Sequence, residues 1–335
     1  MTAIFTLFLA FIGGVTLTHF YIQAADGRGP VALPNHRTMH KGRVVVGGGI
    51  PLLVSALITT LIFWPLDPRQ GALIATGLVL AVVSFLDDMQ PISRRLRFAV
   101  HLGAAVACVV SVHYSASIFG DILPFWLDRL LAVLALVWYI NLYNFMDGID
   151  GIASVETATV AGGYAIVVMS LGDWNSVYLG LALAVAGAAL GFLFWNWHPA
   201  RIFLGDVGSI PLGLITGWLM VDLAVRVSLA AALILPLYFA ADASLTILNR
   251  LRKGERIWEP HRSHFYQRSA RAAGSHSVVV KCVIAANCVL VGLAVLALTK
   301  PFVAFALAVL TVAVLLSWMQ FLATRPIPQQ SDEKA

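Results

Sequence analysis

The chain is a succession of long apolar runs separated by short polar connections. The runs are about 14–22 residues long, close to the roughly 20 that a helix needs to cross a bilayer. Backbone groups inside a bilayer must be hydrogen-bonded within the protein, which leaves helices and closed barrels as the choices. Barrel strands alternate apolar and polar residues, whereas Val177–Trp195 and Phe302–Leu322 do not. The pattern therefore predicts an all-α, polytopic transmembrane bundle.

Eleven apolar runs can be placed, so we expect about ten or eleven spans. They cover residues 2–22, 44–64, 71–86, 98–118, 125–143, 152–171, 177–195, 208–221, 227–248, 278–298 and 302–322. The first run has no Lys or Arg before Arg28, which favours a retained span over a secretory signal peptide. No composition shift marks a second domain, so we expect one integral membrane domain over 1–322. Residues 323–335 are predicted to form a disordered polar tail.

The distribution of positive charge predicts the orientation of the bundle. Of 335 residues, 59% are hydrophobic and only 12% charged, which excludes an ordinary soluble domain. Of the 22 Lys and Arg residues, 17 lie in the odd-numbered connections and the tail, and four in the even-numbered ones. Because positive residues gather in cytoplasmic loops, we expect the N-terminus outside and the C-terminus in the cytoplasm. Topology then accounts for the net charge of +5, and no nucleic-acid partner is expected.

Four polar clusters interrupt the apolar pattern, and all fall on the predicted cytoplasmic side. They are Phe85–Met89, Asn141–Gly151, Asn196–Ser209 and Glu259–Arg268. In the second cluster an amide or carboxylate recurs every third residue, so these groups can converge on one ligand. Clustered carboxylates repel one another unless a cation or a shared proton relieves them. The oxygen ligands and the absence of thiolates favour Mg²⁺, with Mn²⁺ as the alternative.

The remaining polar groups are suited to phosphate. The turn Gly205–Ser209 leads into an apolar run, so its backbone N–H groups can face an anion. Positive side chains on the same side are Arg94, Arg95, Arg97, Arg262, His264 and Arg268. Metal-binding carboxylates opposite arginines are what phosphoryl transfer requires, namely positioning and charge neutralisation.

Simpler interpretations exist for each cluster taken alone. Asp87 and Asp88 can be an ordinary solvated helix end, and the arginines can serve topology or contact lipid head groups. His101 and His113 are interpreted as packed or interfacial, and no role is assigned to the histidines at 36, 40 and 198. Glu156 and Asp242 are acids within spans, which makes them candidates for a site. The four clusters together favour catalysis.

These clusters resemble the polyprenyl-phosphate N-acetylhexosamine-1-phosphate transferases of the glycosyltransferase family 4 type. The resemblance runs from Asp87 to Arg268, in the family's order and spacing. It implies a helical membrane protein with a Mg²⁺ site on the cytoplasmic face of the bacterial inner membrane. It also implies that undecaprenyl phosphate attacks the β-phosphorus of a UDP-N-acetylhexosamine, which releases UMP. The lipid bilayer is the third expected partner, and a homodimer is left open.

The resemblance also implies residue roles. Asp206 and Asn144 match metal-binding positions, and Asp150 and Asn196 match positions near the uridine. Asp87 matches an acid often proposed as the base on the lipid phosphate, and Arg97 a phosphate-contacting position. The remaining implied residues are Asp88 and Asp147 as catalytic acids and Arg262, His264 and Arg268 as substrate-binding groups.

The last cluster departs from part of the family because His261–Arg268 contains no run of consecutive histidines. This departure favours the branch that starts O-antigen or related surface polysaccharides over the phospho-MurNAc-pentapeptide translocase, which stays an alternative. A transporter is the alternative of another class. Against it, the polar clusters lie at one face and no inverted repeat is visible.

Overall fold

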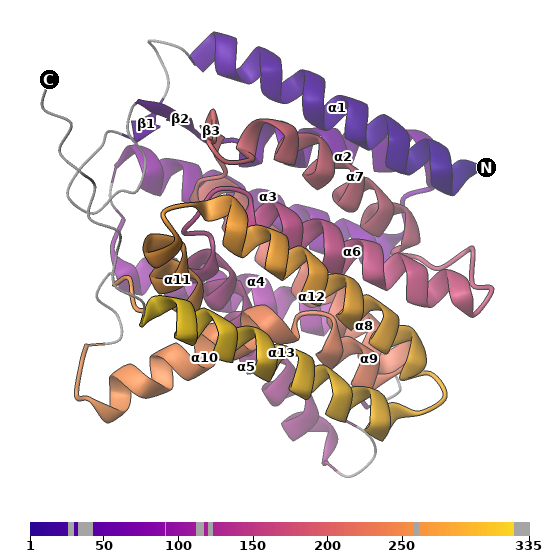
Figure 1. The fold of residues 1–335 in the computed structure, drawn as a ribbon. Helices are drawn as coiled ribbons and strands as arrows, with labels where there is room; N and C mark the ends of the chain where they lie inside the picture. The colour runs from indigo at the N-terminus through magenta and orange to yellow at the C-terminus, as the bar shows by residue number, and fades with distance from the viewer. Residues whose placement is uncertain are drawn as a thin grey trace, which may run out of the picture.

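The computed structural model describes residues 1–25, 30–32, 43–90, 92–111, 117–119, 123–256 and 261–324, and within them the chain forms thirteen helices and one small sheet (Figure 1). The helices are α1 (Thr2–Ala25), α2 (Gly49–Phe63), α3 (Pro68–Met89), α4 (Arg94–Ser111), α5 (Phe125–Met146), α6 (Ile152–Ser170), α7 (Leu179–Asn196), α8 (Asp206–Arg226), α9 (Leu229–Ile234), α10 (Leu237–Arg252), α11 (Phe265–Ala273), α12 (His276–Leu296) and α13 (Pro301–Ala323). Several predictions concern residues outside the described ones: Arg28, His36, Arg37, His40, Lys41, His113, Glu259 and the tail from Arg325 to Ala335.

Eight of these helices are long and apolar enough to cross a membrane, which confirms a polytopic helical membrane protein. They are α1, α3, α5, α6, α7, α8, α12 and α13. The sequence predicted ten or eleven spans, and three apolar runs account for the difference.

Each of the three runs lacks a full-length apolar helix for a physical reason. The run 227–248 is divided into α9 and α10 at Pro236, which has no N–H to donate to the helical hydrogen bonds. The run 44–64 contains a strand and then α2, whose 15 residues span only about 22 Å. The third run, 98–118, lies largely in α4. This helix is not apolar along its full length, because its first turn contains three arginines.

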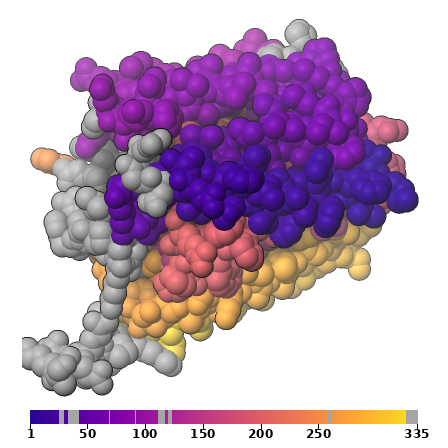
Figure 2. Space-filling model, turned by 90° about the horizontal axis from the view of Figure 1, so that it is seen from above, coloured from indigo at the N-terminus to yellow at the C-terminus, as the bar shows by residue number. Residues whose placement is uncertain are grey.

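The interior of the bundle is formed by α6, α7 and α8, most of whose residues are buried. Helices α1 and α7 pack with their backbones close together. A Cβ placed on Gly187 would lie 2.3 Å from the carbonyl oxygen of Leu7, and one on Gly191 2.2 Å from that of Phe11. Close approach at small residues is the main source of packing energy between membrane helices. Figure 2 shows α1, in indigo, stretched along the length of the molecule.

A three-stranded sheet lies at one end of the bundle and was not predicted. It comprises β1 (Val31–Ala32), β2 (Val44–Val46) and β3 (Ile202–Phe203), with β1–β2 antiparallel and β2–β3 parallel. Its strands are too short to show a periodic pattern in the sequence. The sheet ties the segment before α2 to the segment before α8. In Figure 1, α1 begins at the opposite end of the bundle, whereas α13 ends on the side of the sheet.

Candidate active site

A cavity of about 340 Å³ lies at the sheet end of the bundle and gathers residues that are distant in sequence. Three of the four polar clusters contribute to its wall. The predicted residues that line it are Asp147, Asp150, Asn196, Asp206 and Arg262. Ala32, Val46 and Phe203 of the sheet complete one side. The structure thus brings five of the eleven predicted site residues to one hollow.

The two predicted metal ligands contact each other. Asp206 is the first residue of α8, after Gly205, whose φ of 74° lies in the left-handed region that favours glycine. The side-chain amide of Asn144 donates to Oδ1 of Asp206 at 2.8 Å and to Oγ of Ser209 at 2.9 Å. This orientation leaves the amide oxygen of Asn144 and the second carboxylate oxygen of Asp206 as acceptors. Both are hard oxygen donors of the kind that Mg²⁺ prefers.

Asp147 directly follows the end of α5 and lines the cavity together with the two other acids, Asp150 and Asp206. Burial raises the pKa of its carboxyl to about 7, and the negative charges of Asp206 and Asp150 add to the effect. Three acids that destabilise one another's charge are the expected setting for a bound cation. The donor set therefore fits a hard divalent ion, which Asp206 and Asn144 would hold with Asp147 nearby.

The first cluster lies beside this cavity, and its two acids have different surroundings. Asp87 accepts the backbone N–H of Ile92 at 2.6 Å and the guanidinium of Arg97 at 2.7 Å, so both of its oxygens are used to close the turn between α3 and α4. Asp88 instead accepts the backbone N–H of Val207. A Cβ on Gly205 would lie 3.4 Å from Oδ2 of Asp88. Asp88, and not Asp87, therefore faces the start of α8.

Asn196 lines the cavity, but its side chain is largely engaged within the protein. Its Oδ1 accepts from the backbone N–H of Gly151 at 3.0 Å and from the hydroxyl of Ser154 at 2.8 Å. Its amide donates to the carbonyl of Ile202 at 2.9 Å. Asn196 thus joins the start of α6 to β3, and one amide hydrogen remains for a ligand.

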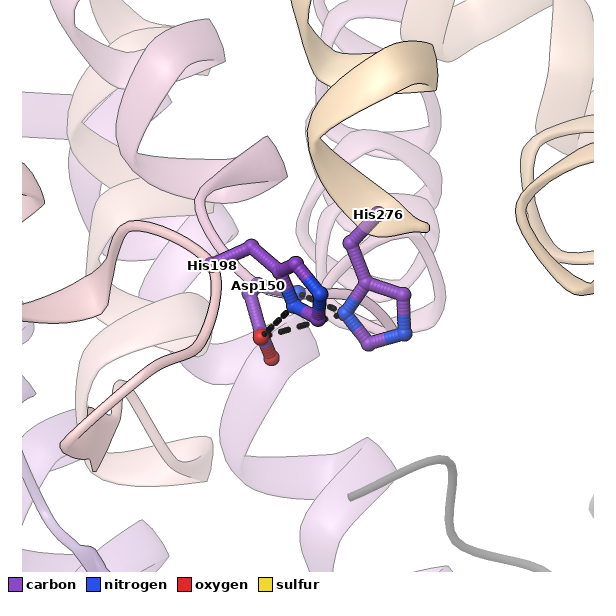
Figure 3. Close-up of side chains that lie close together, drawn as sticks. All are labelled: Asp150, His198 and His276. Atoms are coloured by element: carbon purple, nitrogen blue, oxygen red, sulfur yellow. Dashed lines mark hydrogen bonds and ion pairs between the residues drawn. The ribbon is translucent and has the colours of Figure 1, made fainter. Parts of the chain in front are cut away.

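Asp150 is bound by two histidines that come from different parts of the chain (Figure 3). Its Oδ2 lies 2.6 Å from Nδ1 of His198 and 3.2 Å from Nδ1 of His276, and it accepts the backbone N–H of Ala200 at 3.1 Å. Burial by itself would raise the pKa of Asp150, but the bonds and charge from His276, His198 and Ala200 lower it overall. Asp150 is therefore held as an anion.

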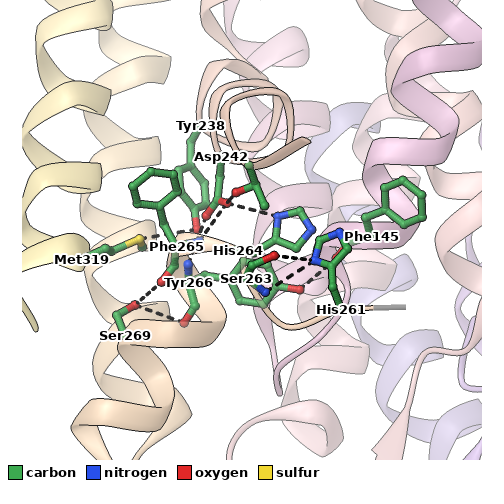
Figure 4. A network of polar contacts seen from close by, with 11 residues as sticks. Phe145, Tyr238, Asp242, His261, Ser263, His264, Phe265, Tyr266, Ser269 and Met319 are labelled. Atoms are coloured by element: carbon green, nitrogen blue, oxygen red, sulfur yellow. Dashed lines mark hydrogen bonds and ion pairs between the residues drawn. The ribbon is translucent and has the colours of Figure 1, made fainter. Parts of the chain in front are cut away.

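The fourth cluster forms a basic loop whose described part is 261–268. This loop is held by Asp242, one of the two acids that the sequence placed within spans (Figure 4). Asp242 is fully buried on α10 and accepts the backbone N–H groups of Phe265 and Tyr266, each at 3.1 Å. Nδ1 of His264 lies 3.2 Å from the same carboxylate. The hydroxyl of Tyr266 donates to the carbonyl of Phe145, at the end of α5, at 2.9 Å. Asp242 thus caps α11 and sets the position of the loop against the cavity.

Two predicted substrate-binding residues of this loop are not in the cavity wall. His264 is buried, bonded to Asp242, and its ring stacks on that of His261 with a centroid separation of 4.9 Å. Arg268 turns toward α13, where it bonds Gln320, and its guanidinium lies 5.2 Å from the ring centre of Phe265. Of the three substrate-binding residues predicted in this loop, Arg262 is the one that lines the cavity.

The structure adds cavity residues that the sequence did not identify. They are Gln267, Arg271 and His276, and His198 joins them through Asp150. His276 is the first residue of α12, so in the sequence it looked like the polar flank of an apolar run. Glu156, the other acid within a span, bonds the amide of Asn287 at 2.8 Å and lies away from the cavity.

Comparison with known proteins shows where this arrangement belongs. The family model described as glycosyl transferase family 4 matches residues 71–224. The probable undecaprenyl-phosphate N-acetylglucosaminyl 1-phosphate transferase of Bacillus subtilis (strain 168) is 30% identical over 268 residues, which cover 75% of this chain and 73% of that protein. The chain belongs to glycosyl transferase family 4.

Other members of the family are also similar to this chain. The phospho-N-acetylmuramoyl-pentapeptide-transferase of Moorella thermoacetica is 33% identical over 191 residues, covering 52% of this chain and 59% of that protein. The protein of the same name from Cutibacterium acnes is 30% identical over 256 residues, covering 61% and 72%. The resemblance to polyprenyl-phosphate sugar-phosphate transferases is thereby confirmed, and within glycosyl transferase family 4 both branches are represented.

Proposed function

We propose that this protein transfers N-acetylhexosamine 1-phosphate from a UDP-sugar to undecaprenyl phosphate, as the first membrane step of a surface polysaccharide. An oxygen of the lipid phosphate forms a bond to the β-phosphorus of the UDP-sugar. The bond from that phosphorus to the bridging oxygen breaks, and UMP leaves with the electron pair. The product is a sugar-diphospho-lipid.

The observation that carries this proposal is the convergence of acids and two guanidinium groups on one cavity. Asp206 and Asp147 form one part of the wall, and Arg262 and Arg271 belong to the same hollow. Arginine binds phosphate oxygens in pairs, whereas carboxylates would repel them without a cation. A UDP-sugar with its diphosphate between these groups satisfies both sets of side chains. A transport path would require polar groups through the membrane interior instead of at one end.

Mg²⁺ is part of the proposal, with Mn²⁺ as a substitute. The ligands would be Asp206 and Asn144, on α8 and α5. When bound, the ion would neutralise the diphosphate and the leaving phosphate. The protein's own contribution is to fix these ligands: the bond from Asn144 to Ser209 and the capping geometry at Gly205 hold both side chains on rigid helices.

Asp88 is the acid we assign to the lipid phosphate, in preference to Asp87. It lines a second hollow of about 580 Å³, whose other lining residues are mostly apolar and include Ala24, Phe85 and Met89. Asp88 therefore lies between a hollow with apolar walls and the start of α8. A phosphate monoester with a second pKa near 6 is largely ionised at neutral pH, so Asp88 need not act as a base, and the bound cation would relieve the repulsion between the two anions.

The sugar distinguishes two branches of the family. The spaced residues His261, Arg262 and His264 favour an N-acetylhexosamine such as N-acetylglucosamine, which the name of the Bacillus subtilis relative also carries. Transfer of phospho-N-acetylmuramoyl-pentapeptide is the second candidate, because two of the similar proteins bear that name.

The test is release of UMP by the purified protein in detergent with undecaprenyl phosphate and Mg²⁺. UDP-N-acetylglucosamine, UDP-N-acetylgalactosamine and UDP-N-acetylmuramoyl-pentapeptide would be compared at equal concentration. We expect turnover with an N-acetylhexosamine and little with the pentapeptide substrate. UMP release only with the pentapeptide would favour the second candidate, and none with any sugar would refute the proposed function.

A further inference from the structure

Glu156 is a fully buried acid that the proposed reaction does not use. It lies on α6, one of the helices long and apolar enough to cross a membrane, and none of its surface is exposed. It does not line the cavity. An ionisable group in the interior of a membrane bundle is costly, so a specific partner for its carboxyl group is expected.

Asn287 of α12 is that partner, and the hydrogen bonds around it fix which way its amide points. Its Nδ2 donates to Oε2 of Glu156 at 2.8 Å and to Oγ1 of Thr159 at 2.9 Å. The hydroxyl of Thr159 donates to the carbonyl oxygen of Val155 at 2.9 Å, so toward Asn287 it can only accept. The amide nitrogen must therefore face Thr159 and Glu156, and both of its hydrogens are used.

Two oxygens of this contact are left over. Within the part of the chain that the structure describes, Oε1 of Glu156 and Oδ1 of Asn287 are buried and have no hydrogen-bond partner. If the carboxyl group were ionised, both atoms would be acceptors without a donor in a site of low dielectric, where such groups are most costly. A single proton on Oε1 satisfies both atoms, because it can be donated to Oδ1 while Oε2 continues to accept from the amide.

The groups that surround Glu156 do not offer its carboxyl group a positive charge. Three tyrosines of α5 and α10 interact with it electrostatically: Tyr139, Tyr143 and Tyr238. Tyr164, on α6 itself, is bonded to Asp222 instead. Helices α7, α9 and α13 contain no ionisable side chain. The other ionisable residues of α5, α8 and α12 lie toward the helix ends or are at least partly exposed: Asp128, Arg129, Asp206, Arg226, His276, Lys281, Cys282 and Cys288.

We propose that Glu156 carries its proton and forms a reciprocal carboxylic acid–amide pair with Asn287, and that this pair positions the cavity by locking α6 to α12. The hydroxyl of the acid donates to Oδ1 of the amide, and the amide donates to Oε2 of the acid. The inference rests on the proposed function only for its effect on catalysis. The pair itself is a statement about two side chains.

The pair can act on the cavity because both helices begin there and run side by side (Figure 1). Asp150 lies just before α6, and Nδ1 of His276, the first residue of α12, is 3.2 Å from its Oδ2. Farther along the two helices, a Cβ on Gly163 would lie 3.0 Å from a methyl group of Val291. The pair of Glu156 with Asn287 lies between these two contacts. It therefore fixes how α12 is rotated against α6, and with it the contact at the cavity.

The first experiment detects the proton directly. Infrared spectra of the purified protein in detergent are recorded at pH 7, and the spectrum of Glu156→Gln is subtracted from that of wild type. We expect a carbonyl stretching band of a protonated carboxylic acid in the wild type, which is absent in Glu156→Gln. In Asn287→Leu the band should move to higher frequency, because the acid has lost its hydrogen-bond partner. The protonated fraction of Asp147 is present in all three proteins and cancels.

The second experiment is a double-mutant cycle that measures Tm and kcat/KM for UMP release. Glu156→Gln keeps one donor and one acceptor opposite the amide, so both quantities should stay within about threefold or a degree of wild type. Glu156→Leu and Asn287→Leu each leave a buried polar group unpaired, so each should lower Tm by about 3 °C or more and kcat/KM by about tenfold. The double variant removes both polar groups and should regain Tm but not kcat/KM, because an apolar contact does not fix the rotation of α12. Thr311→Val, whose hydroxyl bonds its own helix α13, is the control and should change neither quantity.

The pH dependence has a definite sign. The folded protein keeps this proton, whereas the unfolded chain releases it in mildly acidic solution, so its stabilising effect is lost as the pH rises. The Tm of wild type should therefore fall relative to that of Glu156→Gln between pH 5 and pH 9. Asn287→Asp places a second acid in the pair, which needs a further proton. We expect this variant to keep activity at pH 6 and to lose it at pH 8.

The outcomes separate the inference from its basis. Absence of the acid band in wild type at pH 7 would overturn the pair. A Tm that rises with NaCl but not with choline chloride in wild type, and with neither in Glu156→Gln, would assign the two oxygens to a monovalent cation and would also overturn it. Recovery of kcat/KM together with Tm in the double variant would show a merely structural role and would overturn the positioning role. An acid band and a Tm cycle as expected, in a protein that releases no UMP with any sugar, would refute the proposed function and leave the pair supported.

Discussion

Arg97 and Asp87 are bound to each other, with Nη1 of the arginine 2.7 Å from Oδ2 of the acid. The family resemblance gave these residues separate roles, one as phosphate contact and one as base. The pair closes the turn between α3 and α4, and the neighbouring Asp88 faces α8.

The first prediction follows from this pairing. We expect Asp88→Asn to lower kcat by about a hundredfold or more, since it removes a charge at the reaction centre. Asp87→Asn and Arg97→Gln should each cost less, and the double variant should be no worse than either, because both break the same bond. If Asp87 were the base, high pH would partly rescue Asp87→Asn; we expect a defect that is constant with pH.

The second prediction concerns the metal ligand. Asp206→Asn removes a carboxylate that faces the ion and two phosphates, so we expect activity to fall about a hundredfold or more. The Mg²⁺ concentration for half-maximal rate should rise, as measured by titration. Asp173→Asn, at the exposed opposite end of the bundle, is the matched control. A normal Mg²⁺ titration in Asp206→Asn would exclude this residue as a ligand.

The third prediction is a pH dependence that arises from Asp147, whose pKa burial and neighbouring acids raise to about 7. The folded protein holds this proton more tightly than the unfolded chain, so its stabilising effect is present at low pH and is lost as the pH rises through about 7. Without Mg²⁺ at pH 8, Asp147→Asn should therefore have a Tm about 2–4 °C above wild type. The difference should shrink as the pH falls and vanish only below about pH 3.8, where the unfolded chain also keeps the proton. A Tm difference independent of pH would contradict the assignment.

The fourth prediction tests whether Asp242 acts through the basic loop. Asp242→Asn keeps the size of the side chain but weakens its hydrogen bonds to the first turn of α11 and to His264. We therefore expect kcat/KM to fall roughly tenfold to a hundredfold. The Mg²⁺ requirement should not change. His264→Ala combined with Asp242→Asn should cost no more than the worse single change. Thr246→Val, which removes one 3.3 Å bond to the same carboxylate, is the milder control and should stay near wild type.

The fifth prediction concerns orientation. The excess of Lys and Arg in alternate connections predicts a cytoplasmic C-terminus and an external N-terminus. A reporter that is active only in the cytoplasm should be active when it is fused after Ala335. An epitope placed before Met1 should be accessible on intact cells. The opposite result would place the candidate site on the outer face, where UDP-sugars are not supplied.

Much of this protein could be read from the sequence because a bilayer restricts backbone structure to a few forms. Apolar runs such as 125–143 and 302–322 became α5 and α13 with small shifts at their ends. The polar clusters were equally visible, because they interrupt the succession of apolar runs. Five residues predicted in this way, Asp147, Asp150, Asn196, Asp206 and Arg262, line one cavity in the structure.

Tertiary structure decided what each polar group does, because a side chain's partners depend on contacts between distant segments. The spacing of residues in the sequence cannot show that Asp87 is paired with Arg97. Nor can it show that His198 and His276, 78 positions apart, both contact Asp150. Nor can it show that Pro236 divides one apolar run into α9 and α10, since membrane helices sometimes continue through proline. The sequence by itself determined a membrane bundle and the chemical kinds of group in its site. Packing determined which of those groups face the cavity and which hold the others in place.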